Sequence, residues 1–369
     1  MRQEWTERPD LWEVLRGENR AIVLYGMGNG ADKVLRVCAE KEIPVRAVFA
    51  SDGFVRGQSF HGMPVRSWGD VKATYGADGV VVLTAFASSR PEVLENVRRI
   101  ASEACLRIPD VPVYGEDLFD RAFFAGHLGE LEAARALLSD EDSRRIFDLV
   151  LEYKLTGDPD CLWRAVSDPE EVARTVTRPE RFRVAADLGA YTGDSVRELI
   201  GQAPALEKVY AMEPDERNFR KLSDYAAAEE RARVVPVCAA AWDRECDLTY
   251  ADGGNRGASA TVNRSAVLSD RPVRPRTVRA LPLDRVVGED AVDFIKYDVE
   301  GSEREAILGS SGVIRRSHPV LLVSVYHRSE DLFALPLLVR RLFPAYRSFF
   351  LRRFSGFPAW DLNFYASDD

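Results

Sequence analysis

A glycine-rich turn that leads from an apolar run into a helical pattern occurs twice in this chain. The first turn, GMGNGA at 26–31, follows apolar residues 21–24 and fits the G-x-G-x-x-G/A pattern of a dinucleotide-binding turn. The second, DLGAYTG at 187–193, ends another apolar run and precedes a helical pattern at 195–200. Such turns form where a parallel strand passes into its crossover helix, so both favour an α/β fold.

Strand and helix patterns alternate on either side of a helical stretch. Before it, strand patterns at 21–25, 45–50 and 79–86 alternate with helical patterns at 31–41 and 91–104. Residues 128–176 carry apolar residues at helical spacing and no strand signal. Strand patterns then resume at 183–189, 208–214, 233–241, 292–300, 319–327, 346–354 and 361–367. We predict two Rossmann-like domains, residues 1–125 and 181–369, joined by a helical connector at 126–180.

Charge and cysteine usage limit the classes of partner. The 369 residues include 59 acidic and 50 basic ones, a balance that disfavours a nucleic-acid partner. The short basic runs at 271–279 and 352–353 are interpreted as solvated loops or small-anion contacts. Because the chain has no apolar run of about 18 residues, no membrane span is expected. Five cysteines without a C-x-x-C pair, and no apolar signal region, predict a cytoplasmic protein.

Polar residues stand at the ends of three strand patterns in the second half. Glu213 comes 24 residues after Gly189, where a carboxylate can accept hydrogen bonds from both hydroxyls of a ribose. Asp298 and Glu300 end the pattern at 292–300, and His327 ends the pattern at 319–327. Since the carboxyl ends of parallel strands meet at one edge, we expect a site for a nucleoside-type ligand there.

Several segments in order resemble the FkbM-type S-adenosylmethionine-dependent methyltransferases. They are DLGAYTGDS, YAMEPDERNFRKL, LPLDRV, FIKYDVEGSEREAILGS and VYHRSEDL with LNFYA, and they span about 183–367. The resemblance implies a class I methyltransferase fold, a seven-stranded sheet whose last strand is antiparallel. It also implies O-methylation of hydroxyls on sugars, polyketides and related metabolites.

The same resemblance assigns site residues one by one. Glu213 and Pro214 match the ribose loop, Ala240 lies where adenine is flanked, and Asp298 and Glu300 match the acidic motif beside the transferred methyl. The turn around the methionine end of the cofactor corresponds to Asp187, Gly189, Ala190, Tyr191, Thr192 and Gly193. Tyr191 departs from the pattern, because many methyltransferases have glycine or asparagine there.

Methyl transfer to an alcohol also requires removal of a proton. His327 is the predicted base because its ordinary pKa lies near neutrality, with Asp298 orienting it or acting as base itself. Alternatively Asp298, Glu300 and His327 hold a divalent ion such as Mg²⁺ that acidifies a bound hydroxyl. Lys296 is interpreted as a mainly structural lysine. Glu303 and Glu305 are placed on a solvated helix face.

Two other functions stay open, and the acceptor cannot be named. The first is an NAD(P)-dependent oxidoreductase that uses the turn at 26–31, with Asp52 as its ribose acid. The second is a non-catalytic nucleotide-binding or assembly module. The N-terminal domain of sugar O-acyltransferases is similar to this chain in segments 24–35, 48–52 and 60–65. The resemblance suggests a substrate related to sugars or nucleotide-sugars, or a domain that serves docking or homodimer formation. A small-molecule acceptor is expected to meet residues 128–176, 251–280 and 328–336, with 251–263 as a covering loop.

Overall fold

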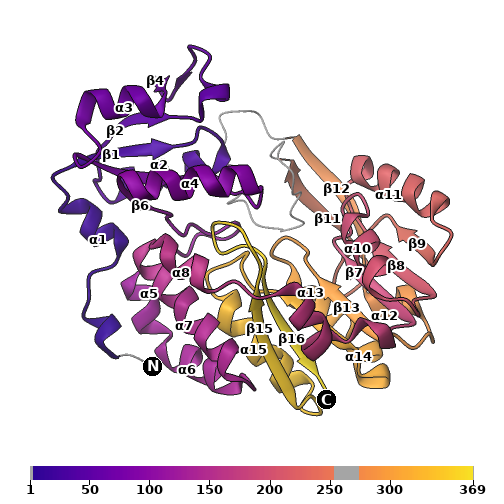
Figure 1. The fold of residues 1–369 in the computed structure, drawn as a ribbon. Helices are drawn as coiled ribbons and strands as arrows, with labels where there is room; N and C mark the ends of the chain where they lie inside the picture. Colours follow the sequence, from indigo (N-terminus) through magenta and orange to yellow (C-terminus); the bar gives the residue numbers. More distant parts are fainter. Residues whose placement is uncertain (1–2, 253–273, 369) are drawn as a thin grey trace.

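The computed structural model describes residues 3–252 and 274–368, which form two α/β lobes (Figure 1). We call the part that carries the first sheet, residues 3–107, the N-terminal lobe, and the part that carries the second, residues 184–368, the C-terminal lobe. The predicted covering loop lies outside the described residues from position 253 to its end at 263. In the described part of the chain, no helix combines the length and apolar character needed to cross a membrane.

The N-terminal lobe contains a six-stranded sheet of order β3-β4-β2-β1-β5-β6, in which β3 alone runs antiparallel to its neighbour. The strands are β1 (Ala21–Tyr25), β2 (Val45–Phe49), β3 (Ser59–Phe60), β4 (Met63–Arg66), β5 (Val80–Thr84) and β6 (Cys105–Arg107). The helices are α1 (Leu11–Arg16), α2 (Asn29–Glu40), α3 (Trp68–Tyr75) and α4 (Pro91–Glu103), with short 3₁₀ turns η1 (Gln3–Thr6) and η2 (Asp52–Phe54). The predicted strand–helix alternation is confirmed here.

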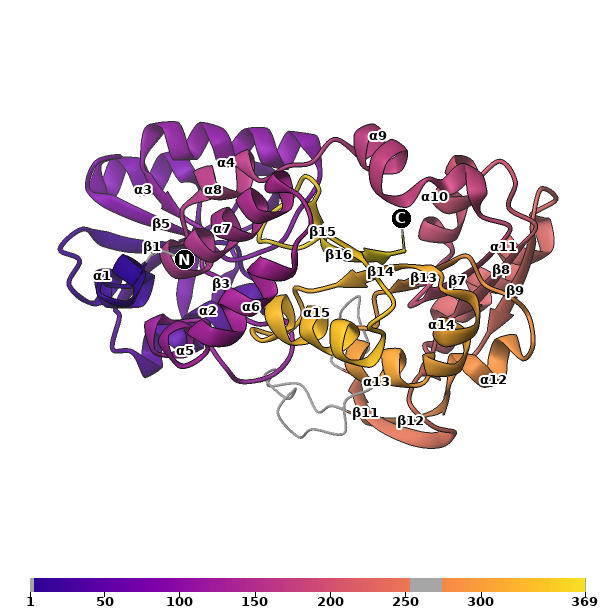
Figure 2. The same ribbon diagram turned by 90° about the horizontal axis from the view of Figure 1, so that it is seen from below.

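Short helices connect the two lobes and pack on the second sheet. They are α5 (Arg121–Gly126), α6 (Leu128–Leu137), α7 (Glu141–Thr156), α8 (Pro159–Arg164) and α9 (Pro169–Val172), followed by η3 (Ala173–Thr177) and η4 (Pro179–Arg181). Helix α7 lies against β15 (Ser348–Arg353), and α6 lies beside α15 (Asp331–Leu342), as Figure 2 shows. The domain boundaries at 125 and 180 stay a prediction.

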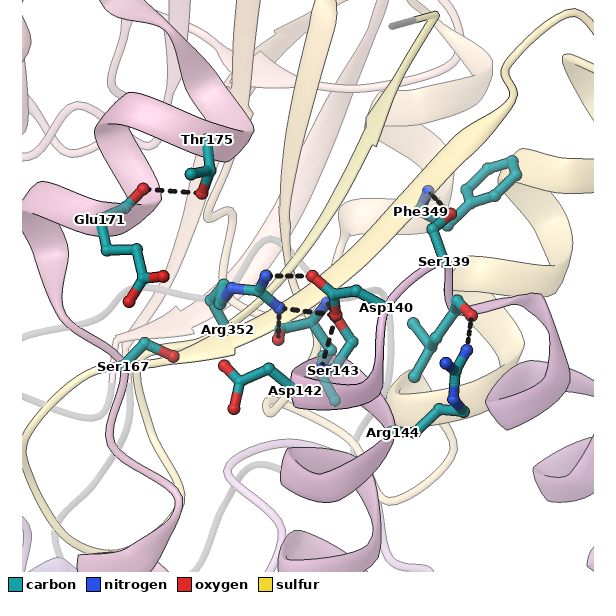
Figure 3. A network of polar contacts seen from close by, with 12 residues as sticks. Ser139, Asp140, Asp142, Ser143, Arg144, Ser167, Glu171, Thr175, Phe349 and Arg352 are labelled. Atoms are coloured by element: carbon teal, nitrogen blue, oxygen red, sulfur yellow. Dashed lines mark hydrogen bonds and ion pairs between the residues drawn. The ribbon is translucent and has the colours of Figure 1, made fainter.

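The contact between α7 and β15 corrects the interpretation of the basic pair at 352–353. Arg352 is 6% exposed and Arg353 is fully buried. The guanidinium of Arg352 pairs with Asp140, the residue that caps α7, and donates to Ser143 Oγ at 2.6 Å (Figure 3). Arg353 donates to the carbonyl of Leu162 at 2.8 Å. Both arginines therefore hold the connector on the sheet instead of facing solvent.

The C-terminal lobe contains a seven-stranded sheet of order β15-β16-β14-β13-β7-β8-β9. Its last strand, β16, is antiparallel to both neighbours, as predicted. The strands other than β15 are β7 (Val184–Leu188), β8 (Lys208–Met212), β9 (Arg233–Val237), β13 (Phe294–Tyr297), β14 (Val320–Ser324) and β16 (Leu362–Ser367). Each lies within one of the seven predicted strand patterns, because the strands inside the sheet are buried and read as apolar runs, while β9 lies at its edge and is only partly buried.

Five further helices and a small sheet complete the C-terminal lobe. The helices are α10 (Asp194–Gln202), α11 (Glu216–Ala228), α12 (Leu283–Val287), α13 (Glu303–Leu308) and α14 (Ser311–Ser317), in addition to α15. The small sheet consists of β10 (Ala240–Ala241), β12 (Arg274–Leu281) and β11 (Cys246–Asp252), in that order. The sequence patterns did not indicate β11 and β12.

The two lobes touch through the loop between β15 and β16. Phe357 in this loop is 2% exposed, and its ring centroid lies 5.4 Å from that of Phe86, which follows β5. Ser88 and Phe357 also form an isolated antiparallel bridge. The carboxyl end of β5 in the N-terminal lobe is therefore covered by the C-terminal lobe.

Candidate functional site

A cavity of about 470 Å³ lies at the carboxyl edge of the seven-stranded sheet. Its wall comes from the ends of β7, β8, β13 and β16 and from the start of α10. It is lined by Gly189, Tyr191, Asp194, Ser195, Glu198, Met212, Glu213, Pro214, Asn218, Ala240, Ala241, Lys296, Asp298, Val299, Glu300, Ser302 and Asp361. The predicted edge of the sheet thus contains a concave, mainly polar site.

The second glycine turn brings the chain after β7 close to the chain after β13. Gly189 has φ +88°, and a Cβ atom there would lie 1.9 Å from the carbonyl oxygen of Asp298. The amide N–H groups of Gly189 and Ala190 both donate to the carbonyl of Met212 at 3.0 Å. Only glycine permits this backbone conformation at this separation, so the turn fixes three strand ends together.

Glu213 follows β8 and is 6% exposed at the cavity wall. Its Oε2 accepts from the amide of Tyr191 at 3.0 Å, and its Oε1 accepts from the amide of Asp215 at 2.9 Å. Burial raises the pKa of Glu213 to about 7, against the lowering effect of these two amides. The side chain of Asn218, which also lines the cavity, forms a further hydrogen bond with this carboxylate.

Lys296 joins two carboxylates across neighbouring strands. The register of β13 on β7 places Lys296 opposite Asp187. Its Nζ lies 3.4 Å from Asp187 Oδ1 and 3.3 Å from Asp298 Oδ2. Burial opposes the charged ammonium, but the two carboxylates outweigh it and raise the pKa of Lys296. Lys296 therefore lines the cavity as a counter-ion, whereas the favoured prediction was a mainly structural lysine.

Asp298 is held in its ionised form. Burial alone would raise the pKa of Asp298, but Lys296 and His327 lower it to about 2. The hydroxyl of Tyr326 donates to Asp298 Oδ1 at 3.1 Å. An ionised carboxylate with three such partners is a weak base and a good positioning group.

His327 is buried behind the cavity wall, among carboxylates. Its Nδ1 lies 2.9 Å from Glu303 Oε1, and its Nε2 lies 3.6 Å from Asp298 Oδ1 and 3.6 Å from Glu300 Oε2. Burial lowers the pKa of His327, but Glu303, Glu300 and Asp298 outweigh it and raise the pKa to about 10. These carboxylates move the pKa of His327 away from the near-neutral value on which its predicted role as base was argued, and that role stays a prediction.

Glu303 contradicts the prediction of a solvated helix face. It is 1% exposed, and its Oε1 accepts from the amide of Val299 at 2.9 Å. A buried carboxylate needs a positive partner, and His327 supplies it. Glu305, on the same helix, is half-buried.

Glu300 is a cavity carboxylate whose backbone is strained, and Asp361 is another. It has φ +57°, a left-handed conformation that is rare for a residue other than glycine. Burial raises the pKa of Glu300, while His327 acts in the opposite direction. Its side chain also forms a hydrogen bond with Tyr114, which precedes the connector helices. Strained residues of this kind cluster at functional sites, where their surroundings hold them.

The structure brings part of the predicted set into the cavity wall and leaves the rest outside it. The predicted residues that line the cavity are Gly189, Tyr191, Glu213, Pro214, Ala240, Asp298 and Glu300. The others are not lining residues: Asp187, Ala190, Thr192, Gly193 and His327. Asp187 accepts from Ser195 Oγ at 2.6 Å, and Gly193 packs against Tyr225. Their assigned roles stay predictions.

Sequence reasoning missed Ser195, Tyr326, Asp361 and Tyr114. Ser195 could have been found, because the first turn of a helix after a glycine turn faces the same edge of the sheet. Tyr326 is adjacent to His327, yet its direction depends on how β14 ends. Asp361 and Tyr114 come from distant parts of the chain and carry no motif.

Metal-capable side chains come together in a different combination from the predicted one. In residues 3–252 and 274–368, the group with ligand atoms within 4.8 Å of one another is Glu303, His327 and Asp331. Asp331 Oδ2 already accepts from the amide of Arg328 at 2.8 Å. Asp298 and Glu300 are not members, so the structure does not support the alternative of Mg²⁺ at Asp298, Glu300 and His327.

The first glycine turn has the same backbone connections but different side chains. The amide of Gly26 donates to the carbonyl of Phe49, as that of Gly189 does to Met212. A Cβ at Gly30 would lie 2.6 Å from the carbonyl oxygen of Ala85, so this glycine serves close packing. Position 50, equivalent to Glu213, is a buried alanine, and Asp52 is exposed.

Comparison with protein families agrees with this geometry. The family model described as the methyltransferase FkbM domain matches residues 187–354. These residues are an FkbM methyltransferase domain. The match includes the turn at Gly189, Glu213, the Asp298–Glu300 segment and His327. A comparison with curated proteins finds no match.

Solved structures extend the likeness to both lobes. A crystal structure of the methyltransferase FkbM from Methylobacillus flagellatus KT has a TM-score of 0.69 at 21% identity, over 98% of this chain and 92% of that one. It shares the fold of the N-terminal lobe as well as that of the FkbM domain. Weaker likenesses are precorrin-6y C5,15-methyltransferase from Geobacter metallireducens GS-15 (TM-score 0.31, 14% identity, 55% and 94% covered) and fibrillarin from Aeropyrum pernix with bound S-adenosyl-L-methionine (0.30, 14%, 50% and 66%).

Proposed function

We propose that this protein is an S-adenosylmethionine-dependent O-methyltransferase that acts on a hydroxyl group of a small metabolite such as a sugar, a glycan or a polyketide. The observation that carries the proposal is the shared cavity. In an FkbM methyltransferase domain, one cavity of about 470 Å³ joins Gly189 and Glu213 to Asp298 and Glu300. The first pair suits a nucleoside cofactor, and the second pair lies where an acceptor would meet it.

The residues of the cavity suit S-adenosylmethionine. Glu213 is a buried carboxylate at the cavity wall, and an acceptor of this kind suits the hydroxyls of a ribose. Ala240 and Ala241 line the wall beyond it and leave room for a flat ring. Asp194 and Ser195, at the start of α10, suit the amino-acid end. When bound, the cofactor supplies a methyl group on a positively charged sulfur.

The acidic segment after β13 would bind and deprotonate the acceptor. Asp298, ionised and fixed by Lys296 and Tyr326, orients the acceptor hydroxyl toward the methyl group. Glu300 lines the cavity and takes the proton, because its raised pKa makes it a stronger base than Asp298. His327, charged and buried between them, holds both carboxylates in place. Alignment of the hydroxyl with the methyl group supplies much of the rate.

The proposal is tested with the purified chain, [methyl-³H]S-adenosylmethionine and a polar metabolite extract. Tritium should enter a small molecule, and mass spectrometry of the product should place the methyl on oxygen. The variant Glu300→Gln should lower the rate about 100-fold. Labelling of a carbon or nitrogen atom, or of no small molecule, would contradict the proposal. We infer a cytoplasmic enzyme, to which the five free cysteines are suited.

A further inference from the structure

We propose that Tyr114 is a positioning residue of the methyltransferase site and that it connects the N-terminal lobe to the residues that carry out the methyl transfer. This inference rests on the proposed function, since it concerns the residue that takes the proton. Tyr114 lies between β6 and α5, far in sequence from the FkbM domain at 187–354.

The segment around Tyr114 is fixed along the chain that follows β14. The amide of Tyr114 donates to the carbonyl of His327 at 2.9 Å. Three residues further on, the carbonyl of Asp117 accepts from Ser329 Oγ at 2.6 Å. These two bonds hold the segment in register beside the buried histidine.

The other side of the segment is tied to the N-terminal lobe. Lys33, on α2, donates from Nζ to the carbonyl of Pro112 at 3.0 Å and to that of Val113 at 2.6 Å. Lys33 comes two residues after the end of the glycine turn at 26–31. The first glycine turn and the methyltransferase cavity are therefore linked through a few residues of one segment.

The side chain of Tyr114 lies against the strained turn of the site. A Cβ added at Gly301, which has φ +89°, would lie 3.2 Å from the Cβ and a ring carbon of Tyr114. The hydroxyl forms a hydrogen bond with Glu300, the preceding residue. A left-handed glutamate persists only where its surroundings hold it, and Tyr114 supplies both the packing and the bond.

Loss of the Tyr114 hydroxyl should therefore leave the Glu300 side chain less firmly held, while the cofactor end of the cavity stays intact. The cofactor end is built from β7, β8 and α10, whose contacts to Glu213 do not involve Tyr114. The expected signature is a reduced rate of transfer with unchanged cofactor affinity. Substitution of a residue with only a structural role would instead change the stability, the transfer rate and the cofactor affinity together.

The test compares Tyr114→Phe with the control Tyr75→Phe, which removes a hydroxyl from α3 of the N-terminal lobe, outside the cavity lining. Tritium transfer from S-adenosylmethionine is measured on serial dilutions of the polar metabolite extract, which gives a maximal rate and a half-saturating dilution. Affinity for S-adenosylhomocysteine is measured by calorimetry. Tyr114→Phe should lower the maximal rate about tenfold and keep the affinity within about twofold. Tyr75→Phe should change neither.

A double-variant cycle with Glu300→Gln tests whether Tyr114 acts through Glu300. In the Glu300→Gln background, Tyr114→Phe should lower the rate by less than about twofold further. The inference is overturned if Tyr114→Phe transfers the methyl group at the full wild-type rate, or if the rate losses of the two single variants multiply in the double variant. In either case the proposed function still stands, provided that the wild-type chain transfers the methyl group. A wild-type chain that binds no S-adenosylhomocysteine overturns the proposed function, and this inference with it.

Discussion

The two glycine turns of this protein have the same backbone construction and different surroundings. In each lobe the glycine after the first strand donates to the end of the next strand, at Phe49 or Met212. The residue after that neighbouring strand is Ala50 in the N-terminal lobe and Glu213 in the C-terminal lobe.

The strand on the other side of the first strand, β5 in the N-terminal lobe and β13 in the C-terminal lobe, shows the same contrast. The amide that bonds to the end of the first strand belongs to Ala85 in the N-terminal lobe and to Asp298 in the C-terminal lobe. A glycine pattern therefore predicts a tight strand-to-helix corner. A ligand site requires, in addition, polar side chains from the neighbouring strand ends.

The largest expected effect is that of Gly189→Ala. The new Cβ would meet the carbonyl of Asp298 in a left-handed backbone, and the strain and overpacking together cost about 2–6 kcal/mol. The variant should lose S-adenosylhomocysteine binding in calorimetry and unfold at a lower temperature.

Two alanine variants of the first turn serve as controls. Gly30→Ala, blocked by Ala85, should lower stability yet keep the affinity for S-adenosylhomocysteine within about twofold. Gly28→Ala, with open space around it, should change little. Loss of binding in Gly30→Ala would mean that both turns serve one ligand.

Removal of the counter-ion should be the next largest effect. Lys296→Met leaves Asp187 and Asp298 without their shared cation, which costs about 3–5 kcal/mol of unfolding free energy. Chemical denaturation measures this loss. Adding Asp298→Asn should recover part of it, and a loss below about 1 kcal/mol would show that other groups neutralise the pair.

A smaller effect is expected for the ribose acid. Glu213→Gln should weaken S-adenosylhomocysteine binding about 10–100-fold, the value of a charged hydrogen bond. Asp52→Asn, at the corresponding loop of the N-terminal lobe, should leave the affinity unchanged. Equal effects of the two variants would remove the distinction between the lobes.

The smallest expected effect is a pH dependence of the same binding. Because the pKa of Glu213 is about 7, its ionised fraction falls between pH 8 and pH 6, and the affinity should fall about tenfold. The contribution of Glu213 to the free energy of unfolding depends on pH in the opposite direction to the affinity. This contribution is fully present below pH 4.5, the ordinary pKa of a glutamate, and is lost as the pH rises through about 7. Glu213→Gln should bind weakly at both pH values, and a wild-type affinity that stays constant would contradict the assignment.

The fold and the position of the cavity could be predicted because they follow local patterns. Buried strands read as apolar runs, and Glu213 and Asp298 stand at strand ends that the pattern already located. The pairing of Lys296 with Asp187 depends on strand register, which the patterns do not specify. The raised pKa of His327 depends on Glu303, which a solvated-face interpretation had set aside.

Tyr114 was beyond prediction for a different reason. It is neither in a motif nor in a periodic segment, and it meets Glu300 only because the segment before the connector lies along His327. Arg352 was misread in the same way, since a basic pair looks solvated until the capping residue Asp140 is placed beside it.

We propose that the second glycine turn binds the cofactor and that the first does not. Calorimetry of the wild-type chain with S-adenosylhomocysteine and, separately, with NAD distinguishes the two turns. We expect one saturable site for S-adenosylhomocysteine that is weakened in Glu213→Gln, with no heat of binding for NAD. Binding of NAD without any response to S-adenosylhomocysteine would contradict it.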